Sequence, residues 1–412
     1  MYIRERDHIS YHRFLQVLRK RNKVSQRRVC EGICTDCAMN RFEKGNRMTE
    51  KLMRDRLTAR LGISCEKYED YLLPKEYECW EQRQCIVNAI EKRELKQAKA
   101  ALDIYALEEK NNCINLQFID VMRYMILRLE DAPRELLLDT LRDAIKHTVT
   151  DVRKAIEGEY LLSDQEINLI AELISLEEPK IERIVEYEKL LIYIEHSCWE
   201  NMQKVKIYPR IERLICECSQ KKEEWSDFCY LYKENECYDM AKVIESRRQM
   251  FGFSRKKLTE GICSVRSVVR LERKGVNTSM ELVHQIFERL GLCPEYRRTR
   301  VLTNDVEVLW LWDEVIQNQK DEDFESWEVN LRKLEAGLCM EIPQNKQEIG
   351  CLDATLMYRK GEIGKGEFCR RLEEAFEYTL PITALYTEEE KYLTKSERTI
   401  IDLLKLEKNG KK

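Results

Sequence analysis

The chain of 412 residues contains little of what interrupts helices. It has 14 glycines, 7 prolines and 5 histidines, whereas charged residues make up 35% of it. Scarce Gly and Pro beside abundant Leu, Glu, Lys and Arg are typical of a mostly helical protein. Neither the GxxxxGK(S/T) nor the GxGxxG phosphate-loop pattern occurs, and the five histidines show no catalytic or metal-ligand spacing. The sequence therefore gives no reason to expect an enzyme or a bound cofactor.

Long apolar runs are also missing. No stretch of about 18 apolar residues occurs, so we expect no membrane span. The first residues, Met-Tyr-Ile-Arg-Glu-Arg-Asp, are charged and lack the apolar segment of a signal peptide. The 17 cysteines are scattered through helical patterns, which favours reduced thiols over a disulfide framework. These features together predict a cytoplasmic protein.

The net charge of −4 conceals an uneven distribution. Residues 1–63 carry 16 Lys/Arg and 7 Asp/Glu, and residues 241–300 carry 14 and 6. The remainder is therefore strongly acidic. Because basic islands are the electrostatic footprint of phosphate binding, we expect any nucleic-acid contact to lie in these two segments.

The two basic islands share a repeated stretch. Each copy contains a serine, the string Glu-Gly-Ile-Cys, an Arg–apolar–Glu triplet and a final Arg-Leu-Gly, at an offset of 229 residues. The first copy runs from Ser25 to Gly62 and the second from Ser254 to Gly291. In the first copy, Ser25 and Thr35 have the character of helix N-caps, because their hydroxyls can accept orphan amide hydrogen bonds. Short helices separated by tight turns, the second with an outward-facing start, are the helix-turn-helix arrangement.

Both copies resemble the Cro/repressor (XRE) helix-turn-helix family, which carries Ser/Thr-Gln early in the second helix and Arg-Ile-Glu-x-Gly after the recognition helix. The first copy has Ser25-Gln26 and Arg41-Phe42-Glu43-Lys44-Gly45. The second has Ser254-Arg255 and Arg270-Leu271-Glu272, with one extra residue before Gly275. The Gly-Ile-Cys-Thr/Ser link is similar to that of the peptide-sensing, quorum-sensing bacterial regulators of the RRNPP group. Many of those join this domain to tetratricopeptide (TPR) helical repeats.

The resemblance implies a set of DNA-binding residues. Positions early in each recognition helix would face the major groove, where Arg can contact guanine in a bidentate manner and Val can touch a thymine methyl. Gln26 and Arg255 would reach phosphate or base, and further basic residues would contact phosphate. The family also pairs an Arg of the first helix with the late Glu, which predicts the ion pairs Arg19–Glu43 and Arg248–Glu272. The full DNA-binding set is Gln26, Arg27, Thr35, Asp36, Cys37, Arg41, Arg47, Arg255, Lys256, Ser264, Val265, Arg266 and Arg270.

The acidic sections read as stacked helical hairpins. Apolar residues recur at helical spacing after the first copy, and breaks are expected near 111–112, 131–133, 160–163, Pro179 and Pro209. Residues 300–408 repeat part of this section, since Glu166 matches Glu397 at an offset of 231, but they lack the equivalent of 175–238. Such hairpins stack into a solenoid. We therefore predict an all-α chain of two helix-turn-helix domains (1–65 and 239–294) alternating with TPR-like sections (75–238 and 300–408).

Two alternatives stay open. Cys30, Cys34 and Cys37 lie close together, but tetrahedral zinc needs four ligands and small buried cysteines also pack such turns, so we expect no metal site. A short signalling peptide in the solenoid is implied by the resemblance, with Asn115, Asn168, Asn201 and Asn235 as candidate backbone clamps. The favoured function is a DNA-binding transcription regulator whose partner is double-stranded DNA, and a homodimer would supply four heads. The alternative is a protein-interaction scaffold in which these modules serve assembly.

Overall fold

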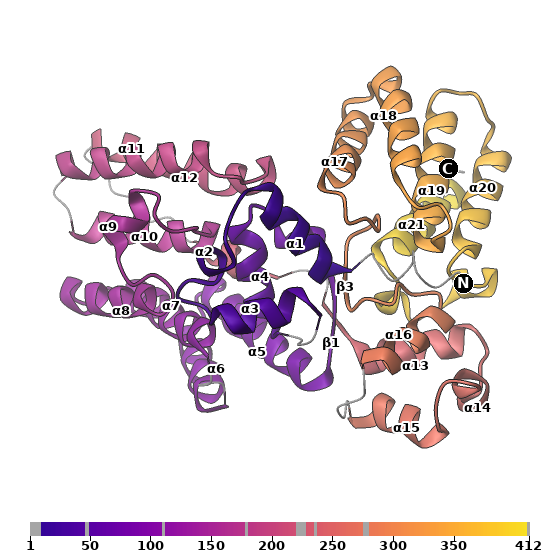
Figure 1. The fold of residues 1–412 in the computed structure, drawn as a ribbon, viewed down its shortest axis with the longest axis horizontal. Coiled ribbons are helices and arrows are strands. Elements are labelled where there is room, and N and C mark those ends of the chain that lie inside the picture. Colours follow the sequence, from indigo (N-terminus) through magenta and orange to yellow (C-terminus); the bar gives the residue numbers. More distant parts are fainter. Residues whose placement is uncertain are drawn as a thin grey trace. The chain divides into compact units, whose positions relative to one another are not determined.

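The computed structural model describes residues 10–45, 49–108, 112–177, 180–219, 228–234, 237–274 and 280–409. They are mostly helical, which confirms the all-α expectation at the level of class. The chain divides into two compact units (Figure 1). The N-terminal unit contains residues 15–66 and 78–234, and the C-terminal unit contains residues 10–14, 67–77 and 237–409, as far as they are described. Helices α1 (Tyr11–Arg21) and α5 (Pro74–Glu91) contribute residues to both.

Each copy of the repeated stretch folds as a four-helix module. In the first module, Ser25 and Thr35 are the N-caps expected from sequence: their hydroxyls accept from the amides of Arg28 and Ala38, both at 3.2 Å. Ser254 caps the matching helix of the second module, accepting from Lys257 at 3.1 Å. The first module consists of α1, α2 (Gln26–Cys30), α3 (Asp36–Glu43) and α4 (Lys51–Arg60). The second consists of α13 (Met240–Met250), α14 (Arg255–Thr259), α15 (Val265–Lys274) and α16 (Met280–Arg289).

Antiparallel helices follow each module. Figure 1 shows α11 beside α12 in the N-terminal unit and α17 beside α18 in the C-terminal unit. After the first module come α5, α6 (Leu95–Glu108), α7 (Cys113–Leu129), α8 (Arg134–Lys146), α9 (Val152–Ile156), α10 (Asp164–Glu177), α11 (Lys180–His196), α12 (Asn201–Ser219) and the 3₁₀ turn η3 (Cys229–Tyr232). After the second come α17 (Val306–Asp321), α18 (Phe324–Gly337), α19 (Pro343–Arg359), α20 (Lys365–Glu377), η4 (Ile382–Tyr386), η5 (Glu390–Tyr392) and α21 (Lys395–Asn409).

The helix bounds repeat as the sequence does. Helices α8 and α20 match at an offset of 231, α7 and α19 at 230, and α6 and α18 at 229. Helix α10 begins at Asp164 and α21 begins at Lys395, again 231 residues apart. Helices α11, α12 and η3 have no counterpart in the second copy, which fits the segment that the sequence comparison found missing. The repeat therefore extends over whole helical hairpins.

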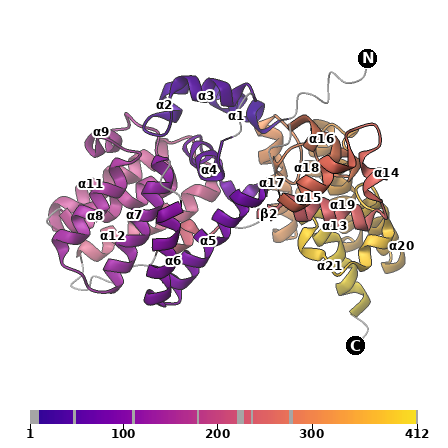
Figure 2. The ribbon, with the colours of Figure 1, turned by 90° about the horizontal axis from the view of Figure 1, so that it is seen from below.

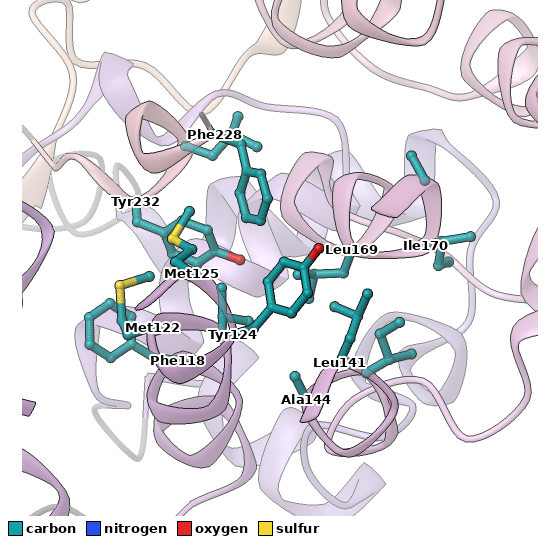
Figure 3. Close-up of a cluster of buried hydrophobic side chains, with 14 of the residues drawn as sticks. Phe118, Met122, Tyr124, Met125, Leu141, Ala144, Leu169, Ile170, Phe228 and Tyr232 are labelled. Carbon is teal, nitrogen blue, oxygen red and sulfur yellow. The ribbon is translucent and has the colours of Figure 1, made fainter. Parts of the chain in front are cut away.

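The core of the N-terminal unit lies among α7, α8, α10 and η3 (Figure 3). The ring of Tyr124 stacks on Phe228 with centroids 6.3 Å apart, and its hydroxyl donates to Glu172 at 2.8 Å. Tyr232 meets Phe118 edge to face, with centroids 6.2 Å apart. Aromatic side chains thus tie the η3 segment to α7, and a buried carboxylate satisfies the one polar atom of Tyr124.

Two features differ from the expectations. Pro209 was expected to end a helix but lies inside α12, so that prediction is wrong. The carbonyl of Val205 loses its donor there, yet Val205 is 69% exposed and water can bind that turn. The described residues also include a small sheet in the C-terminal unit, ordered β2-β1-β3: β1 (Glu69–Leu72), β2 (Cys237–Asp239) and β3 (Arg297–Arg298).

The sheet joins the segments that follow the two modules. Strand β1 pairs antiparallel with β3, so that Glu69 lies opposite Arg298, its own equivalent 229 residues later. Ion pairs of 3.4 Å between Arg298 and Glu69 and 3.1 Å between Arg297 and Asp70 reinforce the pairing. Among the described residues, no helix is both long enough and apolar enough to span a membrane.

Candidate nucleic-acid interface

The second module presents a polar and basic side of α15 to solvent. Ser264 precedes the helix, and its hydroxyl accepts from the amide of Ser267 at 3.2 Å. Val265 is 41% exposed, and Arg266 and Arg270 are exposed as well. The opposite side is buried, with Val268 and Leu271 almost inaccessible. An exposed Val between Ser and Arg at the start of a helix is a group arrangement that can meet base edges.

The first module presents a different set. Thr35 is engaged as the cap of α3, whereas Asp36, Cys37 and Arg41 are exposed. Arg27 is exposed, as is Lys256 in the second module. The candidate Arg47 lies outside the described residues. The first module therefore carries a carboxylate where the second carries Val265, which makes its exposed face less favourable for phosphate.

Both expected ion pairs are present. Arg19 Nε lies 2.5 Å from Glu43 Oε1, and Arg248 Nε lies 2.9 Å from Glu272 Oε1. Each arginine also donates to a backbone carbonyl five residues on, Arg19 to Val24 at 2.7 Å and Arg248 to Phe253 at 2.9 Å. Arg19 and Arg248 thus hold the first helix of each module against the loop before the second helix.

Gln26 and Arg255 complete these networks. Gln26 donates to Glu43 Oε2 at 2.7 Å, and Arg255 Nε lies 2.5 Å from Glu272 Oε2. Burial alone would raise the pKa of Glu43, but the hydrogen bonds of Arg19 and Gln26 lower it overall. Sequence reasoning assigned both side chains to DNA contact and missed this internal role. The signal was available, because in each copy the residue lies 17 positions before the buried glutamate.

Each module is also anchored to its helical repeats by a buried arginine–glutamate pair. In the N-terminal unit, Arg60 of α4 binds Glu166 of α10 with distances of 2.6 and 3.1 Å and donates to the carbonyl of Thr148. In the C-terminal unit, Arg247 of α13 binds Glu397 of α21 at 2.8 and 3.0 Å and donates to the carbonyl of Thr379. All four charged side chains are fully buried.

The repeats offer the same anchor to different parts of the two modules. Glu166 and Thr148 match Glu397 and Thr379, but Arg60 matches Arg289, which instead donates to the carbonyls of Leu258 and Glu260. The glycine contacts differ accordingly. A Cβ at Gly32 (φ +72°) would collide with the Thr148 carbonyl, whereas a Cβ at Gly291 (φ +65°) would collide with that of Thr379.

The docking of the first module therefore involves its α2–α3 link. Arg28 donates to the carbonyl of Gly158 at 2.7 Å, beside α9, which Figure 2 shows next to α2. Cys113 at the start of α7 donates to the carbonyl of Ile33. In the second module, a Cβ at Gly261 would meet open space, and that link lines a groove of about 560 Å³ with α16 and the start of α19.

The cysteine cluster of the first module has the properties of buried thiols. A hydrogen bond with Cys34, together with burial, raises the pKa of the Cys30 thiol, and Asp36 raises it further. A thiol held protonated is a poor metal ligand. Within the ranges that the structure describes, no group of three or more His, Cys, Asp or Glu side chains could hold a metal ion.

The asparagine candidates for a peptide clamp divide into two sets. Asn115 is buried, and its Oδ1 accepts from Tyr105 at 3.2 Å, while Asn168 is fully buried. The side chain of Asn201 and the whole of Asn235 lie outside the described set. Neither Asn115 nor Asn168 therefore faces an open surface. Comparison of the chain with protein-family models, curated proteins and solved structures found no match.

Proposed function

We propose that the chain is a DNA-binding transcription regulator with two helix-turn-helix modules of the Cro/repressor (XRE) type. The observation that carries the proposal is the exposed row of Ser264, Val265, Arg266 and Arg270 on α15. This helix follows the short helix α14 and a four-residue link, which supports a recognition helix placed for the major groove. The paired networks around Glu43 and Glu272 support the same reading, because they fix the helix pair in both modules.

The charge on the modules is consistent with this function once the internal pairs are set aside. Arg60 and Arg247 serve as anchors and do not count towards a surface field. The exposed cations that remain on the second module include Lys256, Lys257, Arg266, Arg270 and Arg273. Such residues supply phosphate contacts, and the base-facing side chains supply specificity.

The helical repeats would bind the regulatory ligand, a short peptide or a protein. This part of the proposal rests on the TPR-like hairpins and on the Gly-Ile-Cys link that resembles the RRNPP regulators. Because a buried pair anchors each module to its repeats, a ligand that alters the repeats would also alter the position of the module.

Selection from a random pool of duplexes tests the proposal. The full chain should enrich a defined sequence, and Arg266→Ala should relax the base preference at one position of it. Glu307→Ala, a change on the exposed side of α17, is the matched control and should leave the motif unchanged. Absence of any enriched sequence, together with absence of duplex binding, would favour the protein-interaction scaffold instead.

A further inference from the structure

A cavity of about 70 Å³ lies inside the N-terminal unit, where the first module meets its repeats. Helices α4, α5, α7, α10 and α12 and the residues around η3 line it. One water molecule needs roughly 10–15 Å³ of such space, so the cavity holds a few waters or a small organic ion. Every lining residue belongs to the N-terminal unit.

Buried hydrogen-bond donors without acceptors line this cavity. Among the described residues, Arg56 Nε, Arg83 Nε and Nη2, and the Tyr232 hydroxyl have no hydrogen-bond partner. The three side chains are only 4%, 4% and 7% exposed. Glu234 lies near Arg83, but at 3.8 Å the contact is an ion pair without a hydrogen bond. Unsatisfied buried donors are costly, so these atoms call for an acceptor inside the cavity.

The carboxylates that also line the cavity are already engaged. Asp55 accepts from Lys51 at 2.5 Å, and Glu234 lies 3.3 Å from the same lysine. Glu66 lies 2.7 Å from Lys206. Burial raises the pKa of Asp164, which reduces the negative charge that it brings to the cavity. The groups left without partners are therefore predominantly donors.

We propose that this cavity binds a small oxyanion, a carboxylate or a phosphate, through Arg56, Arg83 and Tyr232. The anion completes the hydrogen bonding of the two guanidinium groups, and charge-assisted bonds of this kind are among the strongest in proteins. Arg56 belongs to α4 and also donates to Gln117 of α7 at 2.6 Å and to Gln165 of α10 at 2.9 Å. A bound anion therefore ties the first module to the repeats. The site is independent of whether the chain binds DNA.

The C-terminal unit lacks the donors at the matching place. Gln285 of α16 matches Arg56 at the module offset of 229, and Asp313 of α17 matches Arg83 at 230. Asp313 pairs with Lys67. Gln285 lines the open groove of about 560 Å³ between α16 and the start of α19. The second copy thus serves as an internal control, with related architecture and no cluster of buried guanidinium groups.

Calorimetric titration of the full chain at constant ionic strength tests the site, with sodium phosphate and sodium acetate as probes and sodium chloride as the reference. We expect saturable binding of one probe, and hydrogen exchange should slow in residues 51–60 and 229–234 but not in 280–289. Tighter phosphate binding identifies a phosphate-bearing ligand, and tighter acetate binding identifies a carboxylate. Equal effects of chloride, or no saturable binding up to the order of 10 mM, would overturn the proposal.

Tyr232→Phe is the diagnostic variant, because it removes a hydroxyl without a protein partner and keeps the ring against Phe118. It should fold with unchanged or higher stability without anion and should bind the probe about tenfold more weakly or worse, as expected for a lost hydrogen bond to a charged group. Tyr160→Phe, whose hydroxyl bonds Thr150 outside the cavity, should leave probe binding unchanged. Equal affinity of Tyr232→Phe and the parent chain would contradict the site.

Discussion

Replacing Glu166 by Gln measures how strongly the first module depends on its buried anchor. Glu166 is fully buried and binds Arg60 at 2.6 Å, with Arg56 at 3.2 Å. The amide of Gln is nearly isosteric but neutral, so both arginines stay buried while their counter-charge is lost. Removing one partner of a buried pair is strongly destabilising, because the remaining charge is uncompensated.

The pKa of Glu166 gives the magnitude. Burial alone would raise it, but Arg60 and Arg56 outweigh burial and lower the pKa from 4.5 to about 2. At about 1.4 kcal/mol per pKa unit, the ionised carboxylate contributes roughly 3 kcal/mol to folding at neutral pH. Because the folded pKa is depressed, this contribution is complete above about pH 4.5 and is lost as the pH falls towards 2.

Urea unfolding combined with hydrogen exchange is the assay. Glu166→Gln should lower the free energy of unfolding of the N-terminal unit by about 3 kcal/mol at pH 7, and exchange should increase in α4 and α10. Glu177→Gln, which removes an exposed pair with Arg142 at 2.6 Å, is the control and should cost less than about 1 kcal/mol. A loss below about 1 kcal/mol for Glu166→Gln, or one that persists unchanged at pH 2, would refute the reasoning.

Two further outcomes follow from buried and exposed charges. Burial raises the pKa of Glu295 in the C-terminal unit from 4.5 to about 8, so its contribution to stability is lost as the pH rises between these values. Glu295→Gln should therefore stabilise that unit by roughly 2–3 kcal/mol at pH 7 and by little at pH 4, and unchanged pH dependence of thermal unfolding would contradict this. On the proposed interface, Arg266→Ala and Arg270→Ala should each cost about 1–3 kcal/mol of affinity for the selected duplex, and anisotropy titrations should show a smaller loss on random duplex.

Much of the local structure was predictable because its causes are local. The caps at Ser25 and Thr35 follow from one hydroxyl and the residues just after it. The duplication was readable as a constant offset, and the helix bounds repeat it from α6 to α20. The two pairs at Glu43 and Glu272 were expected from family resemblance, and no property of the isolated sequence placed them.

What escaped prediction depends on tertiary context. Strands of two to four residues, such as β1 and β3, carry too little pattern to be recognised, and their pairing joins residues 229 apart. The anchor at Glu166 and Glu397 was visible only as a matching letter. Its partners, Arg60 in one copy and Arg247 in the other, do not occupy equivalent positions, so repeat alignment alone assigns the wrong arginine to the second copy.

The cavity could not have been found from sequence. Arg56, Arg83 and Tyr232 are far apart along the chain, and each is an ordinary residue for a helix of this composition. Their common property, unsatisfied burial, exists only in the folded unit.

Duplex binding by the full chain as a function of salt tests the central proposal most directly. If the exposed cations Arg27, Arg41, Lys256, Arg266 and Arg270 contact phosphates, the logarithm of the binding constant should fall linearly with the logarithm of salt concentration, with a slope of about −4 to −5. The combined variant with Arg266 and Arg270 replaced by Ala should flatten that slope by about 2. No binding at about 50 mM salt, or binding that salt does not weaken, would contradict the proposed regulator.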